Sequence, residues 1–309
     1  MKILIVCRYK ENFINHIMPF ITEQGEAIAK QGAIIDYFTI KGSGLWAYVK
    51  SIAALKKKID EFKPDVVHAH YGLSGVTAVL QRKVPVVVTF HNGETLSKTV
   101  NFVSSFVSLF AKHRIYVARH IYDLCFFKSK KNYTILPCGV DVNVEELNKN
   151  IAREELGLKK DKKYILFGGT FSNLRKNYPL LKQALELLQR DDIEVLEMKG
   201  LSREQITKLM FACNLFALPT KSEGSPQALK EAMVCNCPIL ATDVADIKYL
   251  LGDLEGHYIC SFEAGDAADK IQKALDFSKR TNGKNRIIAL GLSSEKVAEN
   301  IIKIYKSIV

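Results

Sequence analysis

Two glutamates in one short segment, Glu223 and Glu231, carry the strongest chemical signal in the sequence. They follow an apolar predicted strand at 214–219. The pair Ser225–Pro226 between them is typical of a helix start, because proline suits the first helical turn and serine can cap it. Such a helix end offers free amides and a positive dipole to a phosphate, and carboxylates accept paired hydrogen bonds from sugar hydroxyls. The segment therefore indicates a site for a phosphorylated sugar, although an ordinary surface helix could carry the same two glutamates.

The common nucleotide-binding motifs are absent. The first predicted strand, 2–7, leads into residues 8–12, which contain no glycine, whereas a dinucleotide fold needs G-x-G-x-x-G at that turn. The sequence also lacks the P-loop motif, and it has no Asp-x-Asp pair that could hold a divalent metal on a diphosphate. We therefore expect neither a nicotinamide or flavin cofactor nor a metal.

Short apolar runs alternate with amphipathic stretches along the whole chain, which predicts two doubly wound α/β domains. Strands are predicted at 2–7, 33–40, 64–69, 84–90, 115–118, 133–137, 163–168, 193–198, 214–219, 238–242 and 257–260. Helices are predicted at 13–31, 46–62, 144–156, 177–189, 202–212 and 264–279. The expected domains are 1–142 and 143–292, followed by a C-terminal helix, 293–309, that crosses back to the first domain. Ligands of such folds bind beyond the carboxyl ends of the strands, so two domains that face each other form a cleft.

The Glu223–Glu231 segment resembles the E-x7-E signature of the retaining GT-B glycosyltransferases of family 4, also called glycosyl transferases group 1. Glu231-Ala232-Met233 followed by Cys237-Pro238-Ile239 matches the usual continuation. Further blocks in the family's order are Asp65 to Tyr71, Pro85 to Gly93, Ile135 to Asp141, and Gly168-Gly169 with Lys176. The resemblance covers nearly the whole chain and implies a GT-B architecture.

The resemblance also implies roles for single residues. Glu223 would contact the donor sugar, Glu231 the ribose of the nucleotide, and Lys176 the leaving diphosphate. His91 would lie near the transferred sugar. The remaining donor-side residues would be Arg175, Gly169, Thr170, Gly224, Ser225, Pro226, Gln227 and Ala228, several of them through backbone amides.

The sequence departs from the family pattern at two places. Thr170 stands where the family usually has an arginine after the glycine, and Arg175 is the candidate replacement. The glycine-free stretch that begins at Arg8 leaves the acceptor side without its usual loop, and we assign Arg8 and His16 to that side. The donor would be a UDP-, GDP- or similar sugar nucleotide, and the acceptor a glycan or a lipid-linked sugar.

The composition is that of a globular protein of 309 residues, with 48% hydrophobic residues and a net charge of +11. The first 145 residues hold 19 basic and 11 acidic side chains, whereas the other 164 hold 25 and 22. The basic N-terminal part suggests an anionic partner, which could be an acidic membrane. The seven scattered cysteines form no C-x-x-C pair and predict buried, reduced thiols. We expect a cytoplasmic protein that can lie at the inner face of the membrane as a peripheral protein.

Two local patterns leave alternatives open. A set of apolar residues recurs at helical spacing and would form either a core-facing stripe or an interfacial helix that dips into an anionic bilayer. The set is Phe102, Val103, Phe106, Val107 and Phe110. His68 and His70 project to the same side of one strand, where packing and hydrogen bonding are favoured over a metal pair.

The leading interpretation is a retaining, metal-independent sugar transfer in cell-envelope or capsular polysaccharide synthesis. A sugar-nucleotide epimerase on the same fold is the alternative. A basic nucleic-acid-binding protein is disfavoured, because no helix-turn-helix, zinc or aromatic-repeat motif is present.

Overall fold

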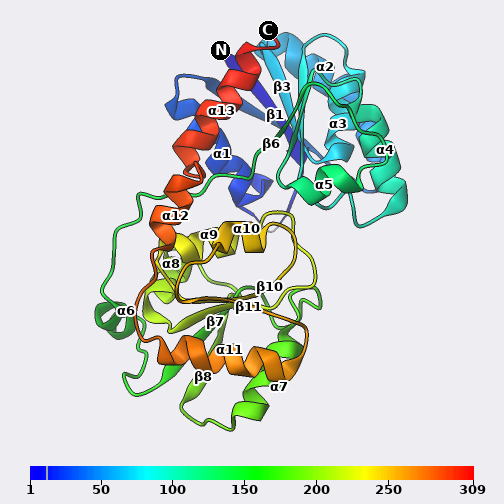
Figure 1. The fold of residues 1–309 in the computed structure, drawn as a ribbon. Helices are drawn as coiled ribbons and strands as arrows, with labels where there is room; N and C mark the ends of the chain where they lie inside the picture. The colour runs from blue at the N-terminus through cyan, green and yellow to red at the C-terminus, as the bar shows by residue number, and fades with distance from the viewer. Residues whose placement is uncertain (12) are drawn as a thin grey trace. The chain divides into compact units, whose positions relative to one another are not determined.

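The structure, a computed structural model, describes residues 1–11 and 13–309; Asn12, at the end of the glycine-free stretch, lies outside the described residues. The chain forms two compact units (Figure 1). Unit 1 comprises Met1–Gly139 together with Ser294–Val309, and unit 2 comprises Val140–Ser293. Each unit has its own parallel sheet, so the predicted fold class of two Rossmann-like α/β domains is confirmed.

Unit 1 is built on a six-stranded parallel sheet in the order β2-β1-β3-β4-β5-β6. The strands are β1 (Lys2–Arg8), β2 (Ile34–Ile40), β3 (Val66–His70), β4 (Val86–Phe90), β5 (His113–Tyr116) and β6 (Tyr133–Ile135). The strand order reverses between β1 and β3, and ligands of doubly wound sheets bind beyond the strand ends at such a point.

Helices cover both faces of this sheet (Figure 1). They are α1 (Pro19–Lys30), α2 (Gly44–Phe62), α3 (Gly72–Leu80), α4 (Lys98–Ser108), α5 (Arg119–Leu124) and α13 (Ser294–Lys306). Helices α1 and α13 pack against each other on one face, whereas α2 and α3 pack side by side on the other. Because both faces are covered, the central strands can be apolar along their whole length.

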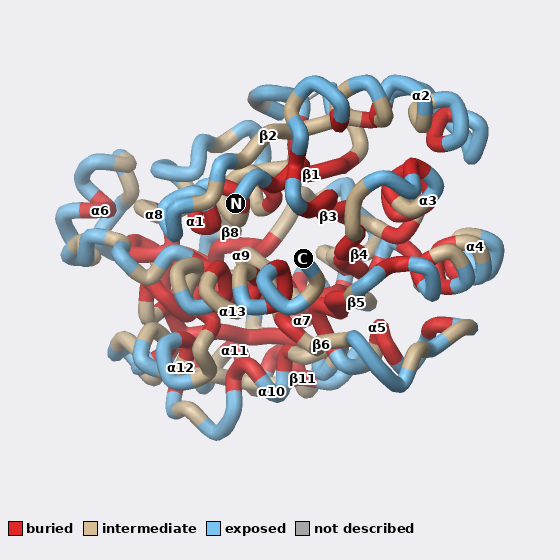
Figure 2. The backbone as a smooth tube through the Cα atoms, turned by 90° about the horizontal axis from the view of Figure 1, so that it is seen from above, coloured by how far each residue is buried: buried red, intermediate tan, exposed pale blue. Residues whose placement is uncertain are grey.

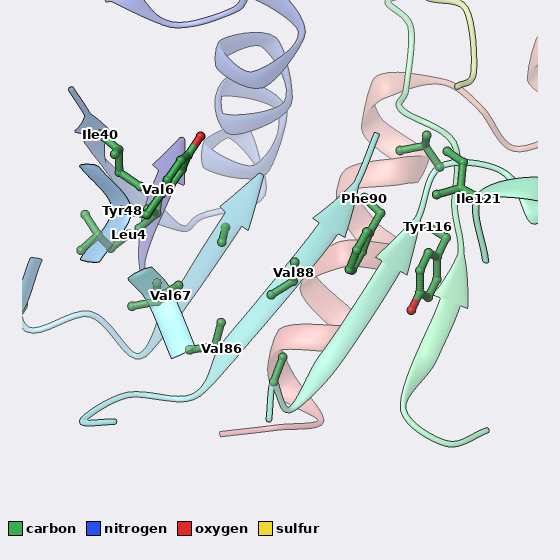
Figure 3. Packing of buried hydrophobic residues seen from close by; sticks show 14 of the residues in the cluster. Leu4, Val6, Ile40, Tyr48, Val67, Val86, Val88, Phe90, Tyr116 and Ile121 are labelled. Atoms are coloured by element: carbon green, nitrogen blue, oxygen red, sulfur yellow. The ribbon is translucent and has the colours of Figure 1, made fainter. Parts of the chain in front are cut away.

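The core of unit 1 explains why these strands are continuous apolar runs. Leu4, Val67 and Val88 are fully buried, and Phe90 and Tyr116 extend the same layer, with ring centroids 4.9 Å apart (Figure 3). The central strands form the buried interior of the unit, shown in red in Figure 2. The edge strand β2 is mostly half-buried.

Unit 2 repeats the same plan with a five-stranded parallel sheet in the order β11-β10-β9-β7-β8. Its strands are β7 (Lys163–Phe167), β8 (Ile193–Glu197), β9 (Leu215–Leu218), β10 (Ile239–Thr242) and β11 (His257–Cys260). Its helices are α6 (Lys149–Glu155), α7 (Tyr178–Leu188), α8 (Arg203–Ala212), α9 (Gln227–Val234), α10 (Ile247–Leu251), α11 (Ala264–Asp276) and α12 (Gly283–Ala289). Helices α7 and α11 cover one face, and α8, α9 and α10 lie on the other (Figure 1). The strand order of this sheet reverses between β7 and β9.

All the predicted strands are present, with ends that agree within two residues. Three helix starts were predicted wrongly. Helix α6 begins at Lys149 and not at residue 144, because Asn148 caps it through a hydrogen bond from the Asn150 amide. The first helix begins at Pro19 and not near residue 13, because proline disfavours a helical conformation at the residue before it. His16 therefore lies in a separate 3₁₀ turn, Ile14–His16. Helix α9 begins at Gln227 with Pro226 itself in the capping position, so Ser225 does not cap it.

Helix α4 reverses the expected pattern of burial. Its buried residues are polar, among them Ser104 and Ser108, whereas Phe102, Phe106 and Phe110 are 51%, 45% and 65% exposed. The core-facing alternative for these phenylalanines is therefore wrong. Of the helices that the structure describes, none is both long enough and apolar enough to cross a bilayer.

The cysteines agree with the expectation from the sequence. All seven are free thiols and all but the half-buried Cys138 are buried. Cys235 and Cys237, the close pair in the sequence, are 2% and 0% exposed.

A buried hydrogen bond attaches the C-terminal helix to the sheet of unit 1. The Tyr305 hydroxyl on α13 lies 2.6 Å from Nδ1 of His68 on β3, and His68 Nε2 lies 2.7 Å from the Thr89 hydroxyl on β4. Both ring nitrogens of this fully buried histidine thus have partners, as a buried polar group requires.

We predict that Tyr305→Phe destabilises unit 1 by about 1–3 kcal/mol, because it leaves a buried histidine nitrogen without a partner. Urea unfolding followed by circular dichroism measures the change. Tyr258→Phe is the matched control, since that exposed hydroxyl makes a hydrogen bond of 3.3 Å to the Lys273 carbonyl. An equal effect of both substitutions would contradict the assignment.

Candidate functional site

The site residues of unit 2 follow the two strands between which the strand order reverses. The segment after β7 carries Gly168, Gly169 and, further on, Lys176, while the segment after β9 leads through Thr220 to Glu223. Because β7 and β9 are parallel neighbours, both segments leave the same edge of the sheet. The topology therefore brings together residues that are about fifty positions apart in the sequence.

Glu223 is the centre of this arrangement. Its carboxylate is only 9% exposed and accepts a hydrogen bond of 2.8 Å from Lys176 Nζ through Oε1. Its other oxygen lies 3.1 Å from Arg175 Nη1, and the same Arg175 atom donates to the Ser222 carbonyl at 2.6 Å. The hydroxyl of the buried Thr220 lies 3.0 Å from Oε1. The site thus holds one carboxylate and two cations, with one net positive charge.

Gly169 permits this geometry through its missing side chain. A Cβ atom at this position would lie 2.8 Å from Lys176 Cγ, closer than real Cβ contacts allow. The aliphatic part of Lys176 therefore passes directly over the Gly169 backbone on its way to Glu223. Gly168 is equally constrained, since its Cβ would lie 2.7 Å from the Phe216 ring. Both glycines are needed for close packing and not for a left-handed backbone.

Helix α9 brings the second glutamate to the same edge. Glu231 lies in the middle of α9, and its Oε1 accepts a hydrogen bond of 2.6 Å from Arg203 at the start of α8. The Glu231 side chain is 15% exposed and that of Arg203 is 51% exposed. Gly224, Ser225, Gln227 and Ala228 lie between the two glutamates at the beginning of α9. Thr170, in turn, follows Gly169 and is half-buried.

Two charged residues near this helix start were missed by the sequence analysis. Lys230 is fully buried in α9, and the half-buried Asp246, whose carboxylate oxygens are buried, precedes α10. Burial raises the pKa of Asp246 to about 6, although the nearby Ser225 hydroxyl and the Lys230 charge act in the opposite direction. The only signal in the sequence is that Asp246 closely follows the end of β10, where functional side chains collect in parallel sheets.

The candidate residues of unit 1 lie where β3 and β4 end. His91 Nε2 lies 3.0 Å from His70 Nδ1, and His91 Nδ1 lies 3.9 Å from the Cys138 thiol. The His70 ring also stacks on His68, with centroids 4.6 Å apart. Burial lowers the pKa of both His68 and His70 well below the usual value, with a smaller contribution from the neighbouring histidine in each case. These rings are therefore neutral at pH 7, and the expected packing role of His68 and His70 is confirmed.

The backbone around His91 is held in unusual conformations. Tyr71 follows β3 with φ of 70° and ψ of 142°, and Asn92 follows His91 with φ of 97°. Non-glycine residues adopt such positive φ values only where the surroundings enforce them, often at functional sites.

Glu94 supplies part of that constraint. Its buried carboxylate accepts hydrogen bonds from the Gly72 amide at 2.7 Å and from the His91 amide at 3.2 Å. Burial raises the pKa of Glu94, while backbone hydrogen bonds lower it. The sequence analysis quoted the preceding residues up to Gly93 and missed this carboxylate, although it directly follows them.

The two residues assigned to the acceptor side have different surroundings. Arg8 ends β1, and its guanidinium donates to the Tyr48 hydroxyl at 3.0 Å and to the Gly42 carbonyl. His16 is exposed and stacks on Tyr9, with ring centroids 4.3 Å apart. Arg8 therefore has a structural contact to α2, and the acceptor roles of both residues stay predictions.

Among residues 1–11 and 13–309, no group of three or more His, Cys, Asp or Glu side chains is arranged to hold a metal ion.

Both units match models of one enzyme family. The model described as Glycosyltransferase Family 4 matches residues 20–144, of which all but the last five lie in unit 1. The model described as Glycosyl transferases group 1 matches residues 195–289, in unit 2. The chain belongs to glycosyltransferase family 4. The match to the second model includes Glu223 and Glu231, and the match to the first includes His91.

Named relatives agree with this assignment. The chain is 25% identical over 249 residues to TuaC of Bacillus subtilis strain 168, which is named as a teichuronic acid biosynthesis glycosyltransferase; the match covers 70% of this chain and 64% of TuaC. It is 26% identical over 260 residues to the D-inositol 3-phosphate glycosyltransferase of Mycolicibacterium smegmatis, covering 69% of this chain and 60% of that protein. The chain thus spans less than two thirds of the length of these relatives.

Solved structures share the fold of the whole chain. Sucrose-phosphate synthase from Thermosynechococcus elongatus superposes with a TM-score of 0.82 at 19% identity, covering 99% of this chain and 98% of that one. HepE of Anabaena, solved with UDP and glucose, gives a TM-score of 0.77 at 15% identity and covers 99% and 100%. At these identities the likeness establishes the GT-B fold of the glycosyltransferase.

The raised pKa of Asp246 predicts how unit 2 responds to pH. Between pH 4 and pH 6 the folded state binds a proton that the unfolded state releases. The free energy of unfolding is therefore not reduced by Asp246 below pH 4, and it falls as the pH rises to 6. A shift to about 6 corresponds to roughly 3 kcal/mol. We expect Asp246→Asn to remove this loss, so that its stability relative to the wild type increases from pH 4 to pH 7.

Urea unfolding at several pH values measures this difference. Asp243→Asn, which changes an exposed carboxylate in the same loop, is the matched control. A pH-independent difference between wild type and Asp246→Asn would show that Asp246 is ionised in the folded protein throughout this range.

Proposed function

We propose that this protein transfers a sugar from a nucleotide diphosphate sugar to a glycan or lipid-linked acceptor, with retention of the anomeric configuration. This sugar transfer would be a step of cell-envelope or capsular polysaccharide synthesis at the cytoplasmic side of the membrane. The observation that carries the proposal is the buried Glu223 carboxylate held between Lys176 and Arg175 at the edge where β7 and β9 end. Ligands of this fold bind at that edge, and the two cations and the carboxylate suit the phosphates and the hydroxyl groups of a sugar nucleotide.

The two cations suit a diphosphate. The leaving group gains negative charge as the bond to the sugar breaks, and a cation that is already in position stabilises that charge without reorganising. Lys176 is held by Glu223 and by the Gly169 backbone, so it is preorganised for this task. Arg175 takes the place of the arginine that Thr170 replaces in the family pattern.

The amides at the start of α9 extend the phosphate site. Ser225, Gln227 and Ala228 each carry a backbone N–H, whereas Pro226 has none. These groups lie at the positive end of the helix dipole, which favours anions. Glu231 lies further along the helix and is assigned to the ribose hydroxyls, with Arg203 orienting its carboxylate.

The reaction can be balanced without a protein nucleophile. The bond between the anomeric carbon and the diphosphate oxygen breaks, and a bond from the acceptor hydroxyl oxygen forms on the same face of the sugar. The acceptor proton passes to the departing phosphate, and the transition state resembles an oxocarbenium ion. The side chains bind, orient and stabilise charge, and His91 is assigned to the transferred sugar.

The relatives support this choice of donor and setting. The HepE structure is described as a complex with UDP and glucose, which makes UDP the first nucleotide to test. The name of TuaC places a relative in teichuronic acid biosynthesis, in line with an acceptor that is a growing glycan.

We predict that nucleoside diphosphate binding needs no divalent metal, because Lys176 and Arg175 supply the positive charge. Isothermal titration calorimetry with UDP or GDP should give the same affinity in EDTA and in manganese. Lys176→Ala should weaken binding under both conditions. Binding that disappears in EDTA and returns with manganese would contradict the prediction.

The two glutamates should respond differently to removal. Glu231→Ala should weaken nucleoside diphosphate binding by about 1.5–3 kcal/mol, or roughly 10- to 150-fold, because a charge-assisted pair to the ribose is lost. Glu223→Gln, which keeps a side-chain oxygen for Lys176 and removes a negative charge, should not weaken nucleoside diphosphate binding and should abolish sugar transfer. Calorimetry with one ligand and an assay for the released nucleoside diphosphate separate the two roles.

Glu231 lies in a helix whose neighbours are buried, so circular dichroism must first show that its variant is folded. Arg203→Gln is a useful companion, because it removes the partner of Glu231 and leaves the carboxylate in place. Unchanged affinity in a folded Glu231→Ala protein would overturn the ribose assignment.

A further inference from the structure

Helix α4 presents phenylalanines to the surface because its other face is fixed against α3. A Cβ on Gly72 of α3 would lie 2.3 Å from Ser104 Cβ, so α4 approaches α3 too closely for a larger residue at position 104. The other buried residues of α4 are also small and polar: Asn101, Ser105 and Ser108. The large side chains of the helix are left on the opposite face.

The end of α4 is also held rigidly. The buried Arg114 guanidinium donates to the Ser108 carbonyl at 2.8 Å, to the Leu109 carbonyl at 2.9 Å and to the Ala111 carbonyl at 3.0 Å. These bonds satisfy carbonyls that a helix end leaves without partners. The turn that carries Phe110 is thus fixed, and the exposure of this ring is a property of the fold.

The exposed rings form one cluster, which we call the phenylalanine ridge and define as Phe102, Phe106, Phe110, Phe126 and Phe127. Within it, the Phe106 ring lies 5.8 Å from Phe110 and 5.4 Å from Phe127, and Phe102 lies 5.1 Å from Phe127. Four of the five rings are between 45% and 65% exposed. A contiguous apolar surface of this kind on a protein marks an interaction site.

The ridge is surrounded by positive charge. Residues 96–131 contain seven basic side chains and one acidic side chain, Asp123, which forms an ion pair with Arg119. The exposed lysines of this segment are Lys98, Lys112, Lys128, Lys130 and Lys131. A second copy of this surface would be repelled by the like charge, whereas an anionic surface would be attracted.

A cavity of about 830 Å³ lies beside the ridge, within the size range of ligand pockets. Its lining includes the apolar side chains of Val79, Val107 and Phe110 and the exposed charged residues Asp65, Arg82 and Lys112. Asp65 precedes β3 and Lys112 precedes β5, so the cavity lies at the amino ends of the strands. This edge is opposite to the one that carries His91.

We propose that this surface docks on an anionic bilayer, with the phenylalanine ridge in the acyl region and one acyl chain of an anionic phospholipid in the cavity. The lipid phosphate would lie between Arg82 and Lys112. Apolar rings flanked by lysines are the composition of interfacial membrane anchors. The proposal goes beyond the function proposed above, and its test involves no sugar transfer, so either proposal can fail alone.

Flotation of the full chain with vesicles tests the docking surface. We expect it to float with vesicles of phosphatidylcholine and phosphatidylglycerol, and only weakly with phosphatidylcholine alone. Phe106→Asp combined with Phe110→Asp should reduce partitioning roughly tenfold or more, because two apolar rings no longer enter the bilayer. Leu187→Asp, a change of the same kind at a 60% exposed leucine of α7, should have no effect. Phe110→Asp alone serves if the double variant does not fold.

Two further experiments test the role of the basic side chains and the depth to which the ridge enters the bilayer. Lys112→Glu should weaken flotation about fivefold or more, and added salt should do the same. Phe110→Trp in a Trp46→Phe background leaves one tryptophan on the ridge, and its fluorescence should be quenched by phosphatidylglycerol with brominated acyl chains.

The cavity is tested with a short-chain phosphatidylglycerol below its micelle concentration. We expect saturable binding by calorimetry and its loss in Val79→Phe, which fills the cavity.

Four outcomes would overturn parts of the proposal. Flotation that is absent, or that survives the ridge variants, overturns the docking surface. Equal binding to neutral and anionic vesicles overturns the role of charge. Flotation without saturable binding of the short-chain lipid overturns the acyl site. A dimer in sedimentation velocity that the ridge variants convert to a monomer, without flotation of the wild type, would assign the ridge to a second copy.

Discussion

The burial of the Glu223 carboxylate is the constraint on which the candidate donor site depends. A charge that is 9% exposed is tolerated only with partners that replace its water, and here Lys176, Arg175 and Thr220 do so. Since these partners come from the segments after β7 and β9, the requirement fixes the two segments to each other. The close packing of Lys176 on Gly169 follows from the same need, because a longer path would not bring the ammonium within reach.

The two units apply one topology to different chemistry. In each sheet the strand order reverses beside the first strand, and the candidate residues follow the strands next to that point. Some local features near these strand ends reduce the stability of the fold, and the apolar interiors of the sheets offset that loss of free energy. In unit 1 these are the positive φ values of Tyr71 and Asn92 and the buried Glu94, and in unit 2 they are the buried Lys230 and the buried carboxylate oxygens of Asp246.

The fold was predictable because its signals are local and repeated. Continuous runs such as Val84 to Phe90 identify buried parallel strands from composition alone, and the structure confirms them within two residues. The helix starts at Pro19 and Gln227 were missed by a few residues, since the effect of a proline on its neighbour was underestimated. Helix α4 could not be assigned correctly, because its orientation depends on Gly72 of another helix and on Arg114 of a later strand. Such contacts between distant segments are not visible in a local pattern.

The charges at the two candidate edges differ in a way that suits different ligands. The edge of unit 2 has a net positive trio around Glu223, and this favours a ligand that is itself strongly anionic, such as a diphosphate. The edge of unit 1 carries histidines whose pKa values are lowered by burial, and its carboxylate Glu94 is already bonded to two backbone amides. Neutral imidazoles can donate and accept hydrogen bonds without attracting a second anion. This edge therefore favours an uncharged hydroxyl over a second anion, and the difference in charge separates the kinds of ligand that the two edges suit.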